Sequence, residues 1–407
     1  MERIIHFDFK GAPLKISYLE KVLNCIKTWG ATGILIEWED TFPYKSELVN
    51  FGSIKGCGGD GMYTLKEVQH IMKFAKTIGL EVIQLVQTIG HMEFVLKHPQ
   101  CANLRESVKS PSVVCPSKPD SFKLVCSLVQ QTLDAQPDAK YIHIGADEQQ
   151  RPELVVLLWD DMLRPISVEI LQAYNLGELV EPVIWNYSPI ESFQIESSLW
   201  VTYSKIFQRV LSPVTRYVSN QQAWRRQMAV VEDITFAGVV LTGWSRYEHY
   251  ATLCELLPVS LPSLSCCLRV WDTPTGSDIG GVSEVLPDEQ WPGRDLARCV
   301  HSFVMLRNRC SALLHGDMVS TWLNTWQVER QFTSPSQLEC IASASSALLL
   351  DLKGIQPELS LQLHSITGTR STEEWLQSFL YPIFRQIQQL NTTVLKRIHA
   401  GPSVCPA

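Results

Sequence analysis

A repeated alternation of short apolar runs with longer amphipathic segments constrains the fold of this chain most. Between residue 4 and about residue 258, eight apolar runs of strand length alternate with segments of helical periodicity. Most of the runs are continuously apolar, which is typical of parallel strands that are buried on both faces. The predicted strands are Ile4–Phe9, Gly33–Glu39, Glu81–Gln87, Tyr141–Gly145, Val155–Trp159, Glu181–Tyr187, Ser198–Tyr203 and Gly238–Trp244.

The intervening segments predict helices, because their apolar residues recur every three or four positions. The clearest are 19–26, 68–75 and 121–133. Strand–helix repeats over roughly 250 residues are typical of the (β/α)8 TIM barrel, which we assign to residues 1–260 as the catalytic domain. A doubly wound sheet is the structural alternative, but no glycine-rich dinucleotide fingerprint follows the first predicted strand.

The character of the chain changes after about residue 260. Residues 271–296 contain Pro, Gly, Asp and Ser without clear periodicity, which predicts a loop or linker. Helical periodicity returns near Asp295–Leu314, Ser334–Leu350 and Thr372–Ile398. We therefore predict that residues 261–400 form a linker and a C-terminal α-helical region that packs on the barrel and takes no part in catalysis.

The composition excludes several partners. The formal net charge is -7 and no cluster of Lys and Arg is found, which argues against nucleic acid and against an anionic membrane surface. The N-terminus lacks the pattern of a secretory signal, so we expect a cytoplasmic and nuclear protein. The 12 cysteines are scattered without a C-x-x-C pair, which predicts thiols without disulfides and no zinc site of the usual spacing.

The predicted strand ends are rich in carboxylates and aromatic side chains. In a TIM barrel the active site lies at the C-terminal ends of the strands. Aromatic faces stack on pyranose rings, and carboxylates handle protons and hydroxyl groups, so these ends favour a sugar site. The residues concerned include Asp8, Glu37, Trp38, Glu39, Asp40, His91, Glu93, Asp147, Glu148, Trp159, Asp160, Asp161, Trp185, Tyr187, Trp200, Trp244 and Tyr247.

The adjacent carboxylates Asp147 and Glu148 carry the sharpest signal. Such pairs are common at solvated helix starts, but this pair follows the buried strand 141–146 directly. Neighbouring carboxylates raise each other's pKa, so that one can stay protonated as a general acid. We predict that Asp147 and Glu148 form the catalytic pair.

The run His143-Ile144-Gly145-Ala146-Asp147-Glu148 resembles the fourth-strand signature of glycoside hydrolase family 20, the β-N-acetylhexosaminidases. Further segments resemble the hexosaminidase D branch of that family, and the likeness follows the whole barrel in order. They are Glu37–Tyr44, Trp159–Met162, Glu181–Trp185, Leu241–Trp244, Tyr247–Tyr250 and Cys254–Pro258.

The resemblance implies a retaining exo-hydrolase that removes terminal GalNAc or GlcNAc from glycoconjugates. The resemblance also implies substrate-assisted catalysis, in which the acetamido oxygen of the substrate attacks the anomeric carbon. Glu148 would act first as the acid and then as the base, and Asp147 would orient and stabilise the acetamido group. The implied partner is an N-acetylhexosamine-containing glycan, and no metal or organic cofactor is implied. The oligomeric state stays open, with a homodimer as one option.

The remaining aromatic residues support weaker hypotheses. Trp185, Trp200 and Trp244 either wall the sugar pocket or belong to the barrel core. Either Tyr187 or Tyr247 could donate its hydroxyl proton to the acetamido oxygen, and we favour Tyr187.

Among the polar residues, His91 and Glu93 bind sugar hydroxyls or orient the acid pair, unless they form a purely structural network. Asp160 binds a sugar hydroxyl or caps a helix. We expect His143 to be a buried, hydrogen-bonded core histidine.

One departure from the branch favours a different function. After the seventh-strand tryptophan the branch carries Ser-Ala-Phe-Lys-Gly-Ala, whereas Val201–Phe207 differs. The alternative is a barrel that binds N-acetylated sugars with weak or no turnover, which the intact Asp147-Glu148 pair opposes. A metal-dependent amidohydrolase built on His6, Asp8, His143 and Asp147 needs more strand-end histidines than the chain offers.

Overall fold

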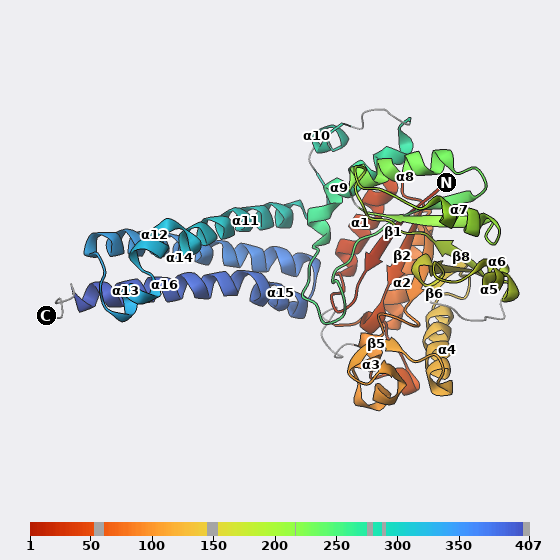
Figure 1. The fold of residues 1–407 in the computed structure, drawn as a ribbon, viewed down its shortest axis with the longest axis horizontal. Coiled ribbons are helices and arrows are strands. Elements are labelled where there is room, and N and C mark those ends of the chain that lie inside the picture. The colour runs from red at the N-terminus through yellow and green to blue at the C-terminus, as the bar shows by residue number, and fades with distance from the viewer. Residues whose placement is uncertain (53–60, 145–153, 216, 275–279, 287–289, 402–407) are drawn as a thin grey trace. The chain divides into compact units, whose positions relative to one another are not determined.

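The structure is a computed structural model that describes residues 1–52, 61–144, 154–215, 217–274, 280–286 and 290–401 (Figure 1). The chain forms two compact units, Met1–Pro292 and Gly293–Ala407. None of the helices in the described ranges combines the length and the apolar character that crossing a membrane requires. No cysteine in these ranges forms a disulfide.

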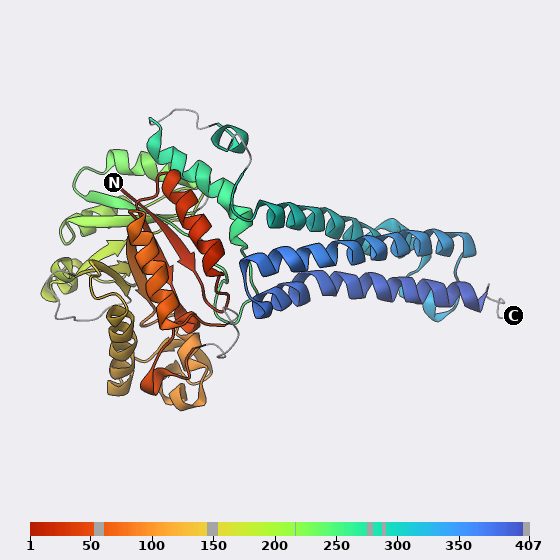
Figure 2. The same ribbon diagram turned by 180° about the vertical axis from the view of Figure 1, so that it is seen from behind.

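The first unit contains a closed barrel of parallel strands, which confirms the predicted TIM-barrel fold (Figures 1 and 2). Around the barrel the strand order is β1-β10-β9-β8-β7-β6-β3-β2. The strands are β1 Glu2–Asp8, β2 Gly33–Glu37, β3 Glu81–Val86, β6 Tyr141–Ile144, β7 Val155–Trp159, β8 Val180–Val183, β9 Arg209–Val214 and β10 Thr235–Leu241.

The interior of the barrel is filled by apolar side chains that most of the strands contribute. Ile4, Leu35, Leu157 and Val240 belong to one buried cluster that also takes residues from β3, β8 and β9. The barrel centre is therefore a packed apolar core, as in other TIM barrels.

The predicted strand Ser198–Tyr203 is wrong. This segment forms helix α7 (Ser197–Ser204), and the seventh strand of the barrel is β9. Trp200 and Tyr203 are the buried residues of α7, which is the three-residue spacing of a helix face. Pro213 lies inside β9, and a proline inside an apolar run argues against a central strand, so the sequence pattern hides this strand.

Helices surround the barrel at the predicted positions. Helix α2 (Leu65–Thr77) begins with a capping box in which Thr64 Oγ1 accepts from Glu67 N–H at 3.2 Å and Glu67 Oε2 accepts from Thr64 N–H at 2.6 Å. The helices of the first unit include α1 Ile16–Thr28, α2 Leu65–Thr77, α3 Glu93–Leu96, α4 Pro119–Asp134, α5 Val168–Ala173, α6 Leu176–Leu179, α8 Val218–Val230, α9 Leu257–Asp272 and α10 Val282–Val285. A small hairpin of β4 (Arg105–Ser107) and β5 (Ser110–Val114) follows α3.

The second unit is helical, as predicted. Its long helices α11 (Arg294–His315), α14 (Pro335–Ile366) and α16 (Tyr381–Ala400) lie side by side (Figures 1 and 2). The short helices are α12 Asp317–Trp322, α13 Thr325–Glu329, α15 Thr369–Trp375 and the π-helix η5 Leu376–Leu380. Helix α14 extends beyond the predicted Leu350 and continues through Pro357.

Candidate active site

Polar and aromatic side chains gather at the C-terminal ends of the barrel strands in two sets. The charged cluster consists of His6, Asp8, Lys10, Glu37 and Glu39, from β1 and β2. The aromatic arc consists of Trp185, Tyr187 and Trp244, which follow β8 and β10. Asp147 and Glu148, which follow β6, lie outside the described residues.

Lys10 is the centre of the charged cluster. Its Nζ lies 3.5 Å from Asp8 Oδ2, 3.5 Å from Glu37 Oε1 and 3.7 Å from Glu39 Oε1, and all four residues are buried. His6 Nε2 lies 3.2 Å from Glu37 Oε2. Buried carboxylates are costly unless they are paired, so the ammonium group is what permits this concentration of negative charge.

The carboxylates of the cluster differ in their affinity for protons. Burial alone would raise the pKa of Glu37, but Lys10 and His6, with Gln87, hold it well below its usual range. Burial and the neighbouring carboxylates Glu37, Asp8 and Asp40 raise the pKa of Glu39 well above its usual range, against the pull of Lys10. Glu37 is therefore the firmly ionised member and Glu39 the one that gains a proton most readily.

The loop after β10 contacts two carboxylates of the charged cluster. Ser245 N–H donates to Asp8 Oδ2 at 2.9 Å, and His249 Nδ1 lies 3.5 Å from Glu39 Oε2. His249 Nε2 lies 2.8 Å from Lys97 Nζ, and because an ammonium group only donates, Nε2 accepts and Nδ1 carries the proton. Burial lowers the pKa of His249 to about 4, so the ring stays neutral at physiological pH.

Glu39, Asp40 and His249 bring possible metal ligands within 4.8 Å of one another. A metal bound at His249 Nδ1 would require the proton to move to Nε2, where it would face the Lys97 ammonium group at 2.8 Å. Metal-binding histidines instead donate this second N–H to an acceptor. The tautomer that Lys97 imposes on His249 therefore disfavours a metal ion at Nδ1.

The aromatic arc brings three predicted residues together. The rings of Trp185 and Tyr187 are stacked with centroids 5.4 Å apart, and Tyr187 meets Trp244 edge-on at 5.4 Å. Trp244 also contacts His6 at 5.7 Å, which joins the arc to the charged cluster. Burial raises the pKa of Tyr187, so its hydroxyl remains a proton donor, whereas Tyr247 is 84% exposed and lies outside the arc.

Trp200 does not join the arc. The structure corrects its predicted position at a strand end, since it lies on α7 and is buried against Phe236 of β10 at a centroid distance of 5.7 Å. Its indole N–H has no hydrogen-bond partner among the described residues. In this position Trp200 packs α7 against the barrel.

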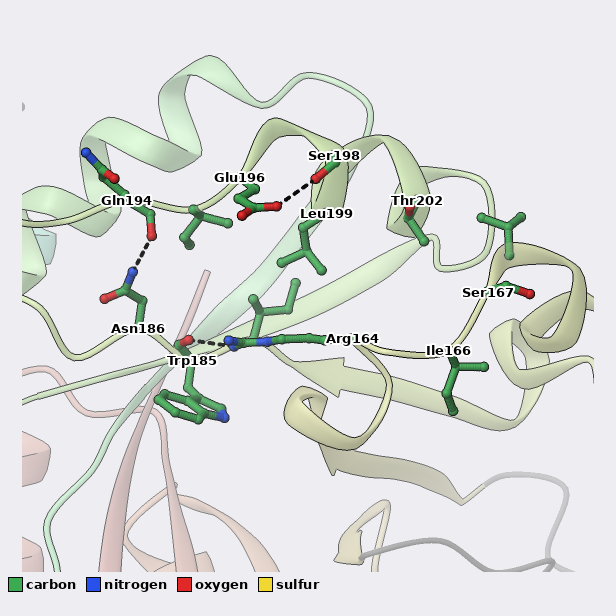
Figure 3. Close-up of a pocket in the computed structure, with 13 residues that line it drawn as sticks. Arg164, Ile166, Ser167, Trp185, Asn186, Gln194, Glu196, Ser198, Leu199 and Thr202 are labelled. Atoms are coloured by element: carbon green, nitrogen blue, oxygen red, sulfur yellow. Dashed lines mark hydrogen bonds between the residues drawn. The ribbon is translucent and has the colours of Figure 1, made fainter.

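Asp160 holds the backbone of the arc. Its carboxylate accepts from Arg164 Nε at 2.7 Å, from Arg164 Nη2 at 2.8 Å and from Trp185 N–H at 3.1 Å. Arg164 Nη2 also donates to Trp185 O at 2.7 Å, and the guanidinium lies 4.9 Å from the centre of the Trp185 ring (Figure 3). Asp160 shares with Arg164 a positioning role that the sequence analysis missed. No side-chain hydrogen bond caps the 3-10 helix at Asp160–Met162, and the predicted sugar contact of Asp160 stays a prediction.

Two histidines and Glu93 complete the predicted set. His91 is exposed with φ 54°, and Glu93 is buried at the start of α3, where burial raises its pKa against the effect of nearby His91. His143 is buried, as predicted, with its ring 4.4 Å from that of Trp159, and burial lowers its pKa to about 3. Its Nε2 has no hydrogen-bond partner within the described ranges, so the predicted hydrogen bond is not seen at this atom.

Comparisons with known proteins identify the family of the chain. The family model "Glycosyl hydrolase family 20, catalytic domain" matches residues 16–256. Hexosaminidase D of Homo sapiens is 30% identical over 458 residues, covering 95% of this chain and 93% of that protein. Hexosaminidase D of Bos taurus is 35% identical over 320 residues, covering 66% of this chain and 91% of that protein.

Similar solved structures have low sequence identity to this chain. The glycosyl hydrolase family 20 β-N-acetylhexosaminidase of Streptomyces coelicolor is 13% identical with a TM-score of 0.48. That match covers 64% of this chain and 61% of the other, so the chain spans less than two thirds of that protein. On the extent of the family match and of the curated relatives, the chain belongs to glycosyl hydrolase family 20, the β-N-acetylhexosaminidase family of glycoside hydrolases.

Proposed function

We propose that this glycoside hydrolase is a retaining exo-β-N-acetylhexosaminidase that removes terminal GalNAc or GlcNAc from glycoconjugates by substrate-assisted catalysis. The observation that carries the proposal is the aromatic arc beside the charged cluster, at the barrel face where Asp147 and Glu148 follow β6. Stacking rings and fixed polar groups at this face suit a pyranose with an acetamido substituent.

In the proposed reaction the acetamido oxygen of the substrate attacks the anomeric carbon while Glu148 gives its proton to the departing glycosidic oxygen. The resulting oxazolinium ring carries positive charge, which the carboxylate of Asp147 stabilises while it accepts from the acetamido N–H. Glu148, now ionised, removes a proton from the attacking water, and the ring opens to the product with retained configuration.

The arc gives this reaction its positioning groups. The Tyr187 hydroxyl donates to the acetamido oxygen. Trp185 and Trp244, which flank Tyr187, enclose the acetamido group. A donor aimed at the reacting oxygen holds the acetamido group close to the anomeric carbon, and such orientation lowers the barrier for ring closure.

The test is turnover of aryl N-acetyl-β-hexosaminides in the gluco and galacto configurations. Glu148→Gln should lower kcat roughly 10²–10⁴-fold on substrates with poor leaving groups, because the general acid is lost. The variant should keep the far-ultraviolet circular dichroism of the parent. A rate near that of the parent on a natural-type disaccharide would exclude Glu148 as the acid.

A second experiment tests the internal nucleophile. A thiazoline mimic of the cyclic intermediate should inhibit competitively and bind more tightly than substrate, and Asp147→Asn should weaken it. A hexoside without the acetamido group should be almost inert. Trapping a glycosyl group on a carboxylate of the enzyme would instead show a two-carboxylate mechanism.

The hypothesis of a sugar-binding barrel without turnover depended on the segment after Trp200. Because that segment belongs to α7, it is not the seventh-strand loop with which the family pattern was compared. We further propose a nucleocytoplasmic enzyme that needs no metal ion. A fluorescent fusion would test the location, and loss of activity in excess chelator, restored by a divalent ion, would contradict metal independence.

A further inference from the structure

An exposed carboxylate lies directly beside the aromatic arc. Asp161 Oδ1 accepts from Trp185 Nε1 at 3.4 Å, and the Asp161 side chain is exposed. Its neighbour Asp160 is buried and bound by Arg164. Asp161, in contrast, forms no ion pair with any residue in the described ranges, so its negative charge acts on whatever occupies the arc.

Further carboxylates act on the same space. Burial raises the pKa of Tyr187, and the negative charges of Asp160, Asp161 and Glu37 raise it further. A charge that opposes the ionisation of this phenol also opposes any other anion held beside it. Asp160 and Asp161 follow β7, whereas Glu37 ends β2, so the negative field comes from two separate strands.

The cations of this region are already engaged by the protein. Within the part of the chain that the structure describes, those that contact the charged cluster, the arc or the loop after β10 are Lys10, Lys97, Arg164 and Arg246. Arg246 is buried and donates to Lys10 O at 3.1 Å and to Ala251 O at 2.7 Å. The other three hold the carboxylates, the histidine and the carbonyl group described above. An anionic ligand would therefore have to displace an existing bond in order to gain one of these cations.

A sulfate ester on the sugar would experience this field at full charge. It is a strong acid and stays ionised throughout the pH range of an enzyme assay. Its charge is felt over roughly 10 Å at about 0.1 M ionic strength, which exceeds the width of a pyranose ring. The field therefore acts on the ester at any position of the ring, and like charges brought together disfavour binding.

We propose that the carboxylates around the arc, with Asp161 foremost, select a neutral terminal N-acetylhexosamine and exclude one that carries a sulfate ester. The inference rests on the proposed function, since it requires the terminal sugar to occupy the arc. A sulfated terminal residue would first need a separate hydrolysis, in which water releases the sulfate and restores the hydroxyl group. On sulfated glycans the enzyme therefore acts after a reaction of the sulfatase class.

The experiment compares kcat/KM for three aryl substrates. They are 4-nitrophenyl N-acetyl-β-glucosaminide, its 6-O-sulfate and its 6-O-sulfamate, a neutral ester of nearly the same size as the sulfate. At low ionic strength the sulfate should be turned over roughly tenfold less efficiently than the sulfamate, because only the sulfate is charged. Added salt should narrow this difference, since salt screens charges that are accessible to solvent.

A pair of variants locates the charge. Asp161→Asn keeps an oxygen acceptor for Trp185 Nε1 and removes the negative charge, so the sulfate-to-sulfamate ratio of kcat/KM should rise several-fold. The control is Asp233→Asn, because Asp233 is exposed and precedes β10, at the opposite end of the barrel strands. This variant should leave the ratio at the value of the parent enzyme.

Equal efficiency on the sulfate and the sulfamate, or a difference that salt does not change, would overturn the proposal. An equal loss on both esters relative to the unsubstituted glycoside would show exclusion by size and would overturn it as well. An unchanged ratio in Asp161→Asn would exclude Asp161 as the selecting charge. Failure of the parent enzyme to turn over the unsubstituted glycosides would instead overturn the proposed function.

Discussion

The charged cluster and the aromatic arc, at the C-terminal ends of the barrel strands, differ in the chemistry and the burial of their side chains. Around β1 and β2 the side chains are charged and buried, with Lys10 only 1% and Glu37 only 1% exposed. Around β8 and β10 they are aromatic, and Trp185, Tyr187 and Trp244 keep part of their surface accessible. Buried charges are held by their partners, whereas partly exposed rings can exchange water for a ligand. The charged cluster therefore acts as a frame and the aromatic arc as a contact surface.

The largest expected effect tests the frame. Lys10→Met leaves Asp8, Glu37 and Glu39 buried without their cation and should lower the free energy of unfolding by about 3–5 kcal/mol, measured by urea denaturation. The control is Lys76→Met, which removes the Lys76–Asp138 pair at the surface and should cost about 0–1 kcal/mol. Equal losses for the two variants would show that the cluster is not a frame.

The next prediction tests the contact surface. Tyr187→Phe keeps the ring between Trp185 and Trp244 but removes the hydroxyl that we propose as the donor to the acetamido oxygen, so kcat should fall roughly 10²–10³-fold. The matched control is Tyr247→Phe, because Tyr247 is exposed and lies outside the arc. If Tyr247→Phe showed the larger loss, the donor would be Tyr247.

A smaller effect appears in the pH dependence of stability. Burial lowers the pKa of His143 to about 3, below its ordinary value of 6.5. As the pH falls below 6.5 the unfolded chain gains this proton and the folded chain does not, so stability falls by at most about 1.4 kcal/mol per pH unit until about pH 3. His143→Gln should make the fall in urea midpoint between about pH 6 and pH 4 less steep. The exposed His301 gives the control, and an unchanged slope for His143→Gln would contradict the burial argument.

The smallest effect tests how the arc is held. Arg164→Lys keeps the charge but loses the two-pronged contact with Asp160 and the flat contact with Trp185, so kcat/KM should fall about 3–10-fold. Arg209→Lys is the control, since Arg209 forms a partly exposed pair with Glu181 at 3.5 Å. A matching decrease in both variants would show that Arg164 does not position Trp185.

The fold was predictable because buried parallel strands have a strong local pattern. Strands such as β2 and β3 are continuously apolar and lie where the pattern predicts them. Strand β9 was not predicted, because Pro213 interrupts its apolar pattern. The apolar residues of α7, which precedes β9 in the chain, were predicted as the seventh strand instead.

Those residues of the candidate site that lie just after a barrel strand could be predicted from the sequence, because TIM-barrel active sites lie at the C-terminal ends of the strands. Trp185, Tyr187 and Trp244 were predicted by that rule and meet in the arc. Arg164 and Lys97 were missed, because their partners are set by loop paths that leave no spacing in the sequence. Asp147 and Glu148 lie outside the described residues, and their catalytic roles stay predictions.

The number of paired residues differs between neighbouring strands of the barrel, and this affects where local unfolding begins. Strands β9 and β10 pair from Arg209↔Thr235 to Val214↔Leu241, whereas β8 and β9 pair at Val183↔Leu211, with Ile184 N–H donating to Leu211 O at 2.8 Å. Local opening starts where fewest backbone hydrogen bonds must break. Amide hydrogens near this join should therefore exchange with solvent before those of β1 and β2. Because Trp185 and Tyr187 follow β8 directly, we expect each such opening to loosen the aromatic arc while the charged cluster stays folded.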